Sequence, residues 1–322
     1  MVDATGMPIL PTGSRVFVAG HRGLVGQAVL RRLAREPVAV LTASRADLDL
    51  RRSADVERWF AAQRPDRVVM AAAVVGGIAD NIRRPGDFLH DNLAIQTSVI
   101  EAARRSGVAR LVFLGSGCMY PRDAPQPLRE QDLWAGPPEP TNAAYAVAKR
   151  TGLALCQAYR VQHGCDFVTL VPTNLYGPWD RFDPDRGHVI PALIRRLTAA
   201  RESGAAEAPV WGSGRPRREF LHVDDLAEAV VRALAGDPGA EPINIGTGCD
   251  IAIADLARLI AGLVGYRGRL VFDRSRPDGI PVRRLDTSRA AAILNWQPRT
   301  GLRDGLAQTI EWYQARRGSR RA

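Results

Sequence analysis

The sequence predicts an α/β protein: a doubly wound parallel sheet with a smaller lobe of mixed helices and strands. Three observations predict it, namely the length, the alternation of strand and helix patterns through the first half, and a glycine-rich turn after the first strand. The chain has 322 residues, of which 46% are hydrophobic and 24% charged, enough apolar material for one large core. Alternating strands and helices are typical of folds in which helices connect parallel strands.

Each expected element follows from its local pattern. Short runs rich in β-branched and apolar residues predict strands at Arg15–Ala19, Val38–Leu41, Asp66–Ala73, Arg110–Leu114 and Phe167–Val171. Amphipathic spacing predicts helices at Gln27–Ala34, Ser53–Ala62, Asp91–Ser106 and Ala144–His163, the last two closed by glycine.

The rhythm of the second half is different. Residues 177–187 and 204–218 are rich in Pro, Gly, Asp and Arg and predict loops with short elements. Between and after them we expect a strand and helix within Phe220–Ala235, a strand at Pro242–Ile245, and helices at Ala254–Val264 and Gly305–Arg316. We therefore expect the doubly wound domain to comprise residues 1–178 and 219–246, and the smaller lobe to comprise 179–218 and 247–322.

The basic residues have an unusual make-up. There are 44 of them against 34 acidic residues, a net charge of +10, yet Lys149 is the single lysine. The arginines are dispersed, and no basic helix alternates with aromatic residues, so we expect no nucleic-acid partner. A lysine retained in such a chain marks a place that needs a compact, titratable ammonium, unless it survived by chance.

Several classes of protein are disfavoured. No apolar run approaches the roughly 20 residues that cross a bilayer, and the first ten residues lack both Lys or Arg and a long apolar stretch. The four cysteines show no CxxC spacing, which disfavours a disulfide framework and a zinc site. We expect a cytoplasmic protein without a membrane partner or a bound metal.

The glycine-rich turn carries the first functional signal. Gly20, Gly23 and Gly26 directly follow the first strand, with Leu24 and Val25 opening the first helix. This spacing allows a tight turn and close approach of the backbone to a pyrophosphate, and the N–H groups of the helix start point at it. The turn predicts a dinucleotide site.

The end of the second strand favours NADP(H) over NAD(H). An NAD enzyme places a carboxylate there for the ribose hydroxyls, whereas this strand leads to Arg45 with no acid before Asp47. Arg45 and Arg22 can clamp a 2′-phosphate through charge-assisted hydrogen bonds. Whether Asp47 or Asp49 lies beside the adenine stays open.

A second signal is catalytic. Tyr145 and Lys149 stand four residues apart, on one face of the expected helix. A phenol beside an ammonium is expected to have a lowered pKa and to exchange a proton with a carbonyl oxygen while a hydride moves; the ammonium can also hold the nicotinamide ribose. Ser116 follows the fourth strand, at the sheet edge where ligands bind in this fold class. This Ser–Tyr–Lys set resembles the extended short-chain dehydrogenase/reductase superfamily, whose members act on nucleotide sugars.

Further motifs narrow the resemblance. From Val16 to the last helix the chain is similar to the GDP-L-fucose synthases, most specifically around Cys118 and His188. The matching segments are 71–78, 115–121, 172–178, 188–193, 210–214, 218–225 and 276–279. Two residues depart from that family's pattern: Gly117 stands where a second serine is frequent, and Val74 where a lysine is common.

The resemblance implies a reaction and a set of roles. It implies NADPH-dependent epimerisation at C3 and C5 and reduction at C4 of GDP-4-keto-6-deoxy-D-mannose, giving GDP-L-fucose, with Cys118 as base and His188 as acid. Inversion needs such groups on opposite faces of the sugar. The sequence alone supports only that Cys118 lies near Ser116. Which of the pair acts at which carbon stays open.

Other site residues also come from the resemblance. It implies cofactor contacts from Pro172, Asn174, Leu175 and His188, and contacts to the GDP part of the substrate from Arg196, Trp211, Arg218 and Asp278. Arg195 is an alternative to Arg196 on the same helix. A homodimer formed by Asp91–Ser106 and Ala144–His163 is also implied.

Three functional alternatives remain at this point. One is the same chemistry on another GDP-4-keto-6-deoxy sugar, such as a heptose, with fewer epimerisations. Another is a reductase or dehydratase that inverts no carbon. The third is a regulator that senses NADP without turnover.

Overall fold

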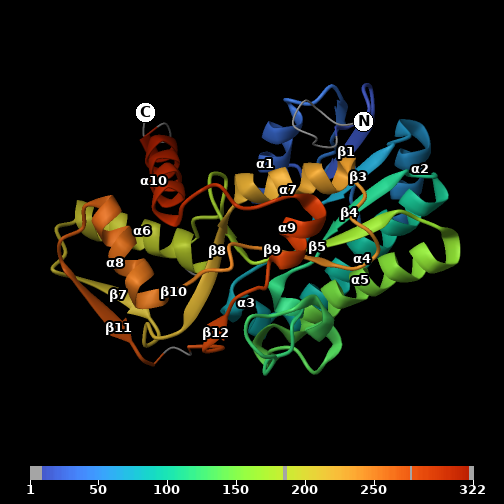
Figure 1. Cartoon of the computed structure of the whole chain (residues 1–322). Coiled ribbons are helices and arrows are strands. Elements are labelled where there is room, and N and C mark those ends of the chain that lie inside the picture. Colours follow the sequence, from blue (N-terminus) through green and yellow to red (C-terminus); the bar gives the residue numbers. More distant parts are fainter. Residues whose placement is uncertain (1–8, 184–186, 276–277, 319–322) are drawn as a thin grey trace.

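A parallel sheet lies at the centre of the computed structural model, which describes residues 9–183, 187–275 and 278–318 (Figure 1). Its six strands run in the order β2-β1-β3-β4-β5-β9, and every pairing is parallel. The strands are β1 (Arg15–Ala19), β2 (Ala39–Leu41), β3 (Arg67–Met70), β4 (Arg110–Leu114), β5 (Phe167–Pro172) and β9 (Ile243–Ile245). The predicted doubly wound α/β class is confirmed.

Helices cover both faces of this sheet (Figure 1). One face carries α1 (Leu24–Leu33), α7 (Val223–Ala235) and α9 (Ser288–Leu294), and the other carries α2 (Ser53–Gln63), α4 (Pro85–Arg105) and α5 (Ala143–His163). Val16 and Val18 of β1 belong to the hydrophobic cluster on the face covered by α1, and Phe17 and Ala19 belong to the cluster on the opposite face. Since successive side chains of a strand point to opposite faces, both sides of the sheet are buried.

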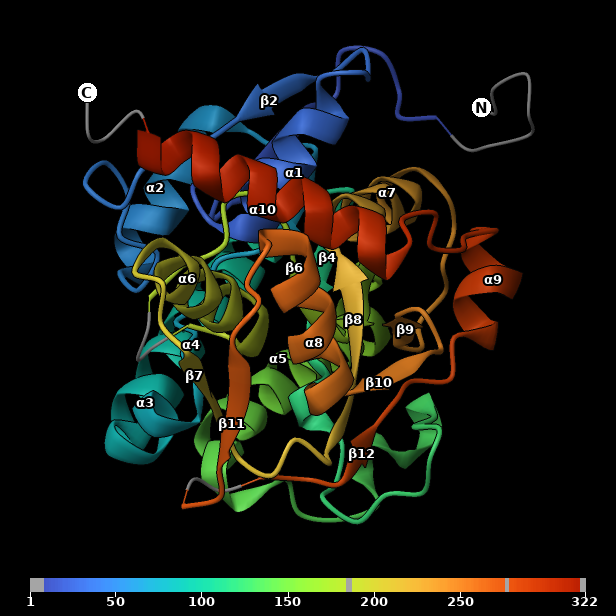
Figure 2. The same ribbon diagram turned by 90° about the vertical axis from the view of Figure 1, so that its left-hand side faces the viewer.

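A second group of elements packs around its own apolar cluster, beside the sheet (Figure 2). Strand β8 (Arg217–His222) pairs with β6 (Asn174–Tyr176), β10 (Asp250–Ala252) and β12 (Val282–Arg283), while β7 (Glu207–Trp211) pairs with β11 (Arg269–Asp273). The helices here are α6 (Val189–Glu202), α8 (Ile253–Val264) and α10 (Leu302–Gly318).

Some boundaries differ from the expected ones. Helix α4 begins at Pro85 rather than at Asp91, because proline suits the first helical position, where its missing N–H costs nothing. The strand expected to reach Ala73 ends at Met70. Short elements that local patterns did not predict are α3 (Ile78–Arg83), α9, η1 (Gly117–Met119), η2 (Glu130–Trp134), η3 (Pro140–Asn142) and strands β6, β7, β10, β11 and β12.

Part of one predicted motif lies outside the described residues, namely residues 276 and 277 of the 276–279 segment. Across the described ranges, no helix is both long and apolar enough to cross a membrane.

One buried carboxylate joins the two groups of strands. Glu219 of β8 is fully buried and accepts hydrogen bonds from the backbone N–H groups of Thr247 (2.5 Å), Gly248 (2.7 Å) and Leu285 (2.8 Å). A Cβ at Gly246, just after β9, would lie 2.3 Å from Glu219 Oε1, so the glycine lets the chain pass this close. The contacts fix the β9–β10 connection and the segment after β12 against β8.

Candidate active site

The glycine-rich turn has the geometry of a phosphate cradle. Gly20 has a φ of +87°, and a Cβ there would lie 2.7 Å from the backbone nitrogen of Ala72. A Cβ at Gly26 would lie 2.2 Å from Gly20 O, whereas one at Gly23 would make only ordinary contact. Gly23 is the N-cap of α1 and caps it with no side chain, so the N–H groups at the helix start are available to an anion.

The residues after β2 fit a phosphate better than two ribose hydroxyls. Asp47 accepts the Ser44 hydroxyl at 2.5 Å, and Asp49 accepts Arg51 Nη2 at 2.7 Å; these hydrogen bonds lower the pKa of both carboxyls, that of Asp49 to about 2. Both acids are thus engaged within the protein. The Arg22 and Arg45 side chains are exposed.

Lys149 occupies a buried position below the sheet edge. Its side chain is almost fully buried on α5, and Nζ donates a hydrogen bond to Leu114 O at 2.8 Å. Nζ lies 4.9 Å from the centre of the Phe113 ring and 5.9 Å from that of Tyr145. Burial lowers the pKa of Lys149 to about 8. A compact ammonium makes this bond to the end of β4 while its side chain stays buried.

The Tyr145 phenol faces Ser116 and Cys118. Burial raises the pKa of Tyr145 above its ordinary value, proximity to Cys118 raises it further, and a hydrogen bond with the Ser116 side chain opposes both. The predicted lowering of this pKa is therefore wrong for this structure. Desolvation outweighs the neighbouring ammonium, which is turned toward Leu114 O. A neutral phenol is the form that can donate a proton.

Cys118 lies in the short helix η1, next to Ser116. The Ser116 hydroxyl accepts the Cys118 N–H at 3.2 Å and caps this helix. The half-buried sulfur faces two donors, Asn142 Nδ2 at 3.3 Å and Arg283 Nη1 at 3.6 Å. Sequence reasoning missed both. Asn142 precedes Tyr145 by three residues, a usable signal, but Arg283 is 165 residues away from Cys118 and gives none.

Arg218 and Asp278 lie close together at the same edge of β8. Arg218 Nη2 donates to Asp278 O at 3.4 Å, and the Asp278 carboxylate accepts Ser213 N at 2.6 Å and Ser213 Oγ at 2.7 Å. Arg218 is paired in register with Arg283 across β8 and β12. Burial and the charge of Arg283 lower the pKa of Arg218 to about 10.

The two neighbouring arginines of α6 point to different places. The Arg196 guanidinium lies 5.1 Å from the centre of the Trp211 ring, and Nη1 donates to Pro209 O at 3.0 Å. Arg195 is exposed and donates to Phe182 O at 2.9 Å. The structure thus brings Arg196, rather than Arg195, to Trp211.

The remaining predicted residues lie at the ends of β5 and α6. Pro172 is the buried last residue of β5; Asn174 and Leu175 follow in β6, where Asn174 Nδ2 donates to Glu219 O at 2.9 Å. His188 is the exposed N-cap of α6. Protein around the ring displaces part of its hydration and lowers its pKa, as does the charge of Arg181.

Within the described residues, no group of His, Cys, Asp and Glu side chains could hold a metal ion. All four cysteines are free thiols. The reactive groups of the site are hydroxyl, thiol, ammonium and guanidinium groups.

Comparison with known proteins identifies the family. The model of the NAD dependent epimerase/dehydratase family matches residues 16–246. The chain belongs to this family. It is 52% identical over 303 residues to "Probable GDP-L-fucose synthase 1" of Oryza sativa subsp. japonica, covering 94% of this chain and 92% of the relative.

Two solved structures of related sequence are similar over almost the whole chain. A GDP-L-fucose synthetase from Naegleria fowleri bound to NADP has a TM-score of 0.90 at 28% identity, covering 97% of this chain and 96% of that one. A GDP-6-OMe-4-keto-L-xylo-heptose reductase from C. jejuni also has a TM-score of 0.90, at 33% identity, and the match covers 95% of this chain and 99% of the reductase chain.

The buried ammonium predicts how stability depends on pH. The pKa of Lys149 is about 8 in the folded chain and 10.5 for an unperturbed lysine. Between those values the unfolded chain binds more protons, so raising the pH favours folding. From pH 7 to 9.5 this adds about 2 kcal/mol to the free energy of unfolding. Urea unfolding of the wild type and Lys149→Met at both pH values should show a gain that the variant lacks. Equal pH dependence in the two proteins would contradict the assignment.

Proposed function

We propose that the chain catalyses the NADPH-dependent 3,5-epimerisation and 4-reduction of GDP-4-keto-6-deoxy-D-mannose to GDP-L-fucose. The observation that carries the proposal is the position of the Cys118 sulfur beside the Tyr145–Ser116 pair. Reduction alone needs a proton donor and a carbonyl clamp, whereas a thiol at the same place adds a base that epimerisation requires. The relative of 52% identity supports the substrate assignment.

NADPH, when bound, supplies the hydride. The backbone N–H groups of Leu24 and Val25 would hold its pyrophosphate, and Gly23, whose own N–H donates to Gly20 O at 3.1 Å, would let the phosphates come close to the turn. The exposed Arg22 and Arg45 would hold its 2′-phosphate. The residues proposed for the nicotinamide end are Lys149, Pro172, Asn174, Leu175 and His188.

The protein groups then divide the proton transfers. The 4-carbonyl acidifies the hydrogens at C3 and C5; Cys118 takes a proton on one face and His188 returns one on the other. Tyr145 gives its proton to the C4 oxygen as that oxygen gains negative charge, and Ser116 donates a hydrogen bond to the same oxygen. The raised pKa of Tyr145 keeps the phenol protonated until then.

The GDP part is assigned to the second group of elements. Arg218 and Arg196 would bind the diphosphate, while the Trp211 face and the Asp278 carboxylate would contact the base and the ribose. We propose a cofactor domain (1–178 and 219–246) and a substrate lobe (179–218 and 247–322), each with its own hydrophobic cluster. The clusters cross these bounds at two places: Leu294 and Trp296 pack in the cluster of the central sheet, and Tyr176 and Phe220 in that of the second group. We also propose a homodimer through the exposed faces of α4 and α5, in the cytoplasm.

A second candidate is the same chemistry on another GDP-4-keto-6-deoxy sugar, such as a heptose, with fewer epimerisations. The similarity to the C. jejuni heptose reductase favours it, as do Gly117 and Val74, which depart from the pattern of GDP-L-fucose synthases. Retention of Tyr145 and Lys149 argues against a regulator without turnover.

Product analysis in D2O tests the proposed function. With NADPH and GDP-4-keto-6-deoxy-D-mannose, NMR should show GDP-L-fucose carrying deuterium at C3 and C5, because both carbons exchange a proton with solvent. Tyr145→Phe should bind NADPH normally yet lose reduction by about 10²-fold or more. A reduced product without deuterium at these carbons would eliminate the epimerase, and full reduction by the variant would eliminate the role of Tyr145.

Cofactor choice gives a separate prediction. Arg45→Gln should weaken NADPH binding by about tenfold and leave NADH binding unchanged, because it removes charge-assisted hydrogen bonds to the 2′-phosphate alone. Fluorescence titration with each cofactor measures both affinities. Arg35→Gln, another exposed arginine, is the matched control and should change neither. Equal losses of affinity for NADPH and NADH would show that Arg45 does not bind the 2′-phosphate.

A further inference from the structure

The Cys118 sulfur has hydrogen-bond donors around it to which the proposed reaction assigns no role. Two N–H donors from distant segments converge on it: Asn142 Nδ2 at 3.3 Å, from the turn before α5, and Arg283 Nη1 at 3.6 Å, from β12. A neutral thiol is a weak acceptor, whereas a thiolate is stabilised by N–H donors and by a nearby positive charge. The arrangement fits the ionised form of the sulfur.

The Arg283 guanidinium has no competing anion within the described part of the chain, where no carboxylate forms an ion pair with it. Its charged neighbour is another cation, Arg218, whose pKa it lowers; Cys118, Asp278 and Glu139 act on that pKa in the opposite sense. Two adjacent guanidinium groups favour a negative charge between or beside them. The sulfur of Cys118 is placed to carry it.

The fold fixes Arg283 at this position. Strand β12 pairs with β8, and the next residue but one, Leu285, donates its N–H to the buried Glu219. A Cβ at Gly117 would lie 4.0 Å from Arg283 Cδ, an ordinary contact distance, so the arginine stem runs beside the short helix that carries Cys118.

We propose that Arg283, assisted by Asn142, is a positioning residue that holds Cys118 as a thiolate ready to remove a proton from the substrate. The inference rests on the proposed function. In the step, the C–H bond next to the carbonyl breaks, its electron pair moves into the carbonyl to form an enolate, and the proton forms an S–H bond. The guanidinium then lacks its counter-charge, which favours loss of that proton to solvent and resets the base.

Other groups around the sulfur are accounted for. Arg283 and Arg218 face it from β12 and β8, and Tyr145 faces it from α5. Arg218, with its pKa lowered to about 10, stays charged at neutral pH, and the raised pKa of Tyr145 keeps the phenol neutral there. Lys149, which lies beside the Tyr145 ring, has a pKa of about 8. It is present in the wild type and in all the variants compared, so its titration cannot account for a difference between them.

The reactivity of the thiol tests this without substrate. Iodoacetamide alkylation of Cys118 from pH 6 to 10, read from its own peptide by mass spectrometry so that the exposed Cys249 does not interfere, reports the thiolate fraction. Arg283→Gln should move the midpoint of the profile upward by about one pH unit or more, and Asn142→Ala by less. Arg283→Lys should restore most of the shift.

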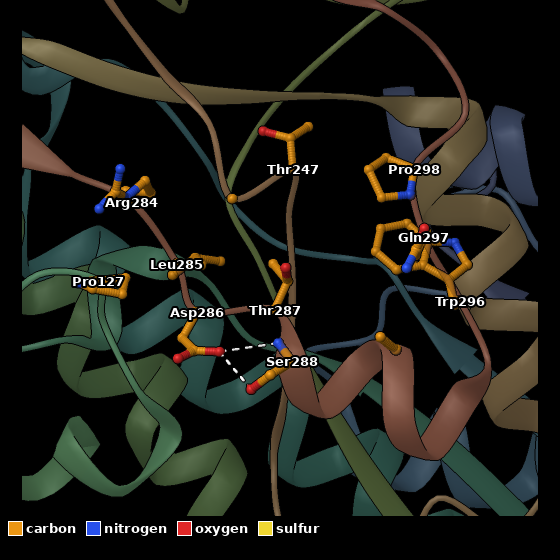
Figure 3. A pocket seen from close by; sticks show the side chains of 12 residues that line it. Pro127, Thr247, Arg284, Leu285, Asp286, Thr287, Ser288, Trp296, Gln297 and Pro298 are labelled. Atoms are coloured by element: carbon orange, nitrogen blue, oxygen red, sulfur yellow. Dashed lines mark hydrogen bonds between the residues drawn. The ribbon is translucent and has the colours of Figure 1, made fainter.

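Arg284→Gln is the matched control. Arg284 is the next residue but lines a different groove, with Asp286 and Ser288 (Figure 3). Its Nη1 lies 3.9 Å from Asp250. Its removal should leave the profile unchanged. If Arg283→Gln fails to fold, Asn142→Ala carries the same test. A wild-type profile in Arg283→Gln, or in Asn142→Ala if only that variant folds, would overturn the proposal.

A second readout separates this inference from the proposed function. With NADP⁺ and substrate in D2O, deuterium exchange at pH 7 should fall about tenfold in Arg283→Gln with KM nearly unchanged. A rise in KM with an unmoved alkylation profile would make Arg283 a substrate ligand instead and overturn the inference alone. Exchange that survives in Cys118→Ser would remove Cys118 as base, and with it the proposed function.

Discussion

The geometry of the site depends on one buried carboxylate. Glu219 sits in the middle of β8, its burial raises its pKa, and three backbone N–H groups offset the cost of its desolvation. Through them it binds the connection that leaves the central sheet and the segment that follows β12. Both arginines near the sulfur lie on the strands fixed in this way, since Arg218 is its neighbour in β8 and Arg283 pairs with Arg218. The thiol comes from the other side, at the end of β4.

Two acidic groups in this pocket occupy opposite environments. The phenol of Tyr145 is half-buried, and desolvation raises its pKa, which keeps it as a proton donor. The Cys118 sulfur has a guanidinium and an amide N–H directed at it, an environment that suits an acceptor. Separating the protonation states of two groups by their surroundings is how one site performs acid and base chemistry at one pH. The Lys149 ammonium lies beside the Tyr145 ring and is hydrogen-bonded to the end of β4.

The sequence predicted those elements of the fold that are determined by interactions between residues close together in the chain. The alternation of strands and helices, the glycine turn and the tyrosine–lysine helix are all defined within a few residues, and the structure contains them. The start of α4 was misplaced because the amphipathic pattern was followed only from Asp91, whereas Pro85 opens the first turn of the helix. Strands β7 and β11 escaped prediction because each is ordered only by pairing with the other, about sixty residues away in the chain.

The site was predictable to the same extent. Ser116, Tyr145 and Lys149 follow from spacing and from position at a strand end. The partners of Cys118 do not, because Arg283 reaches it only through the pairing of β12 with β8. The direction of the Tyr145 pKa shift was also beyond sequence reasoning, since it depends on how far the surrounding chain desolvates the phenol.

Amide hydrogen exchange in the Glu219→Gln protein tests the central claim most directly. In the variant, an NH2 group replaces one of the two carboxylate oxygens and cannot accept a hydrogen bond from a backbone N–H. The N–H groups that were bonded to that oxygen, either that of Leu285 or those of Thr247 and Gly248, should therefore exchange faster than in the wild type. Amides of β3 and β4, which are paired within the central sheet, should remain equally protected. If all three amides exchange as slowly in the variant as in the wild type, Glu219 does not hold these strands together.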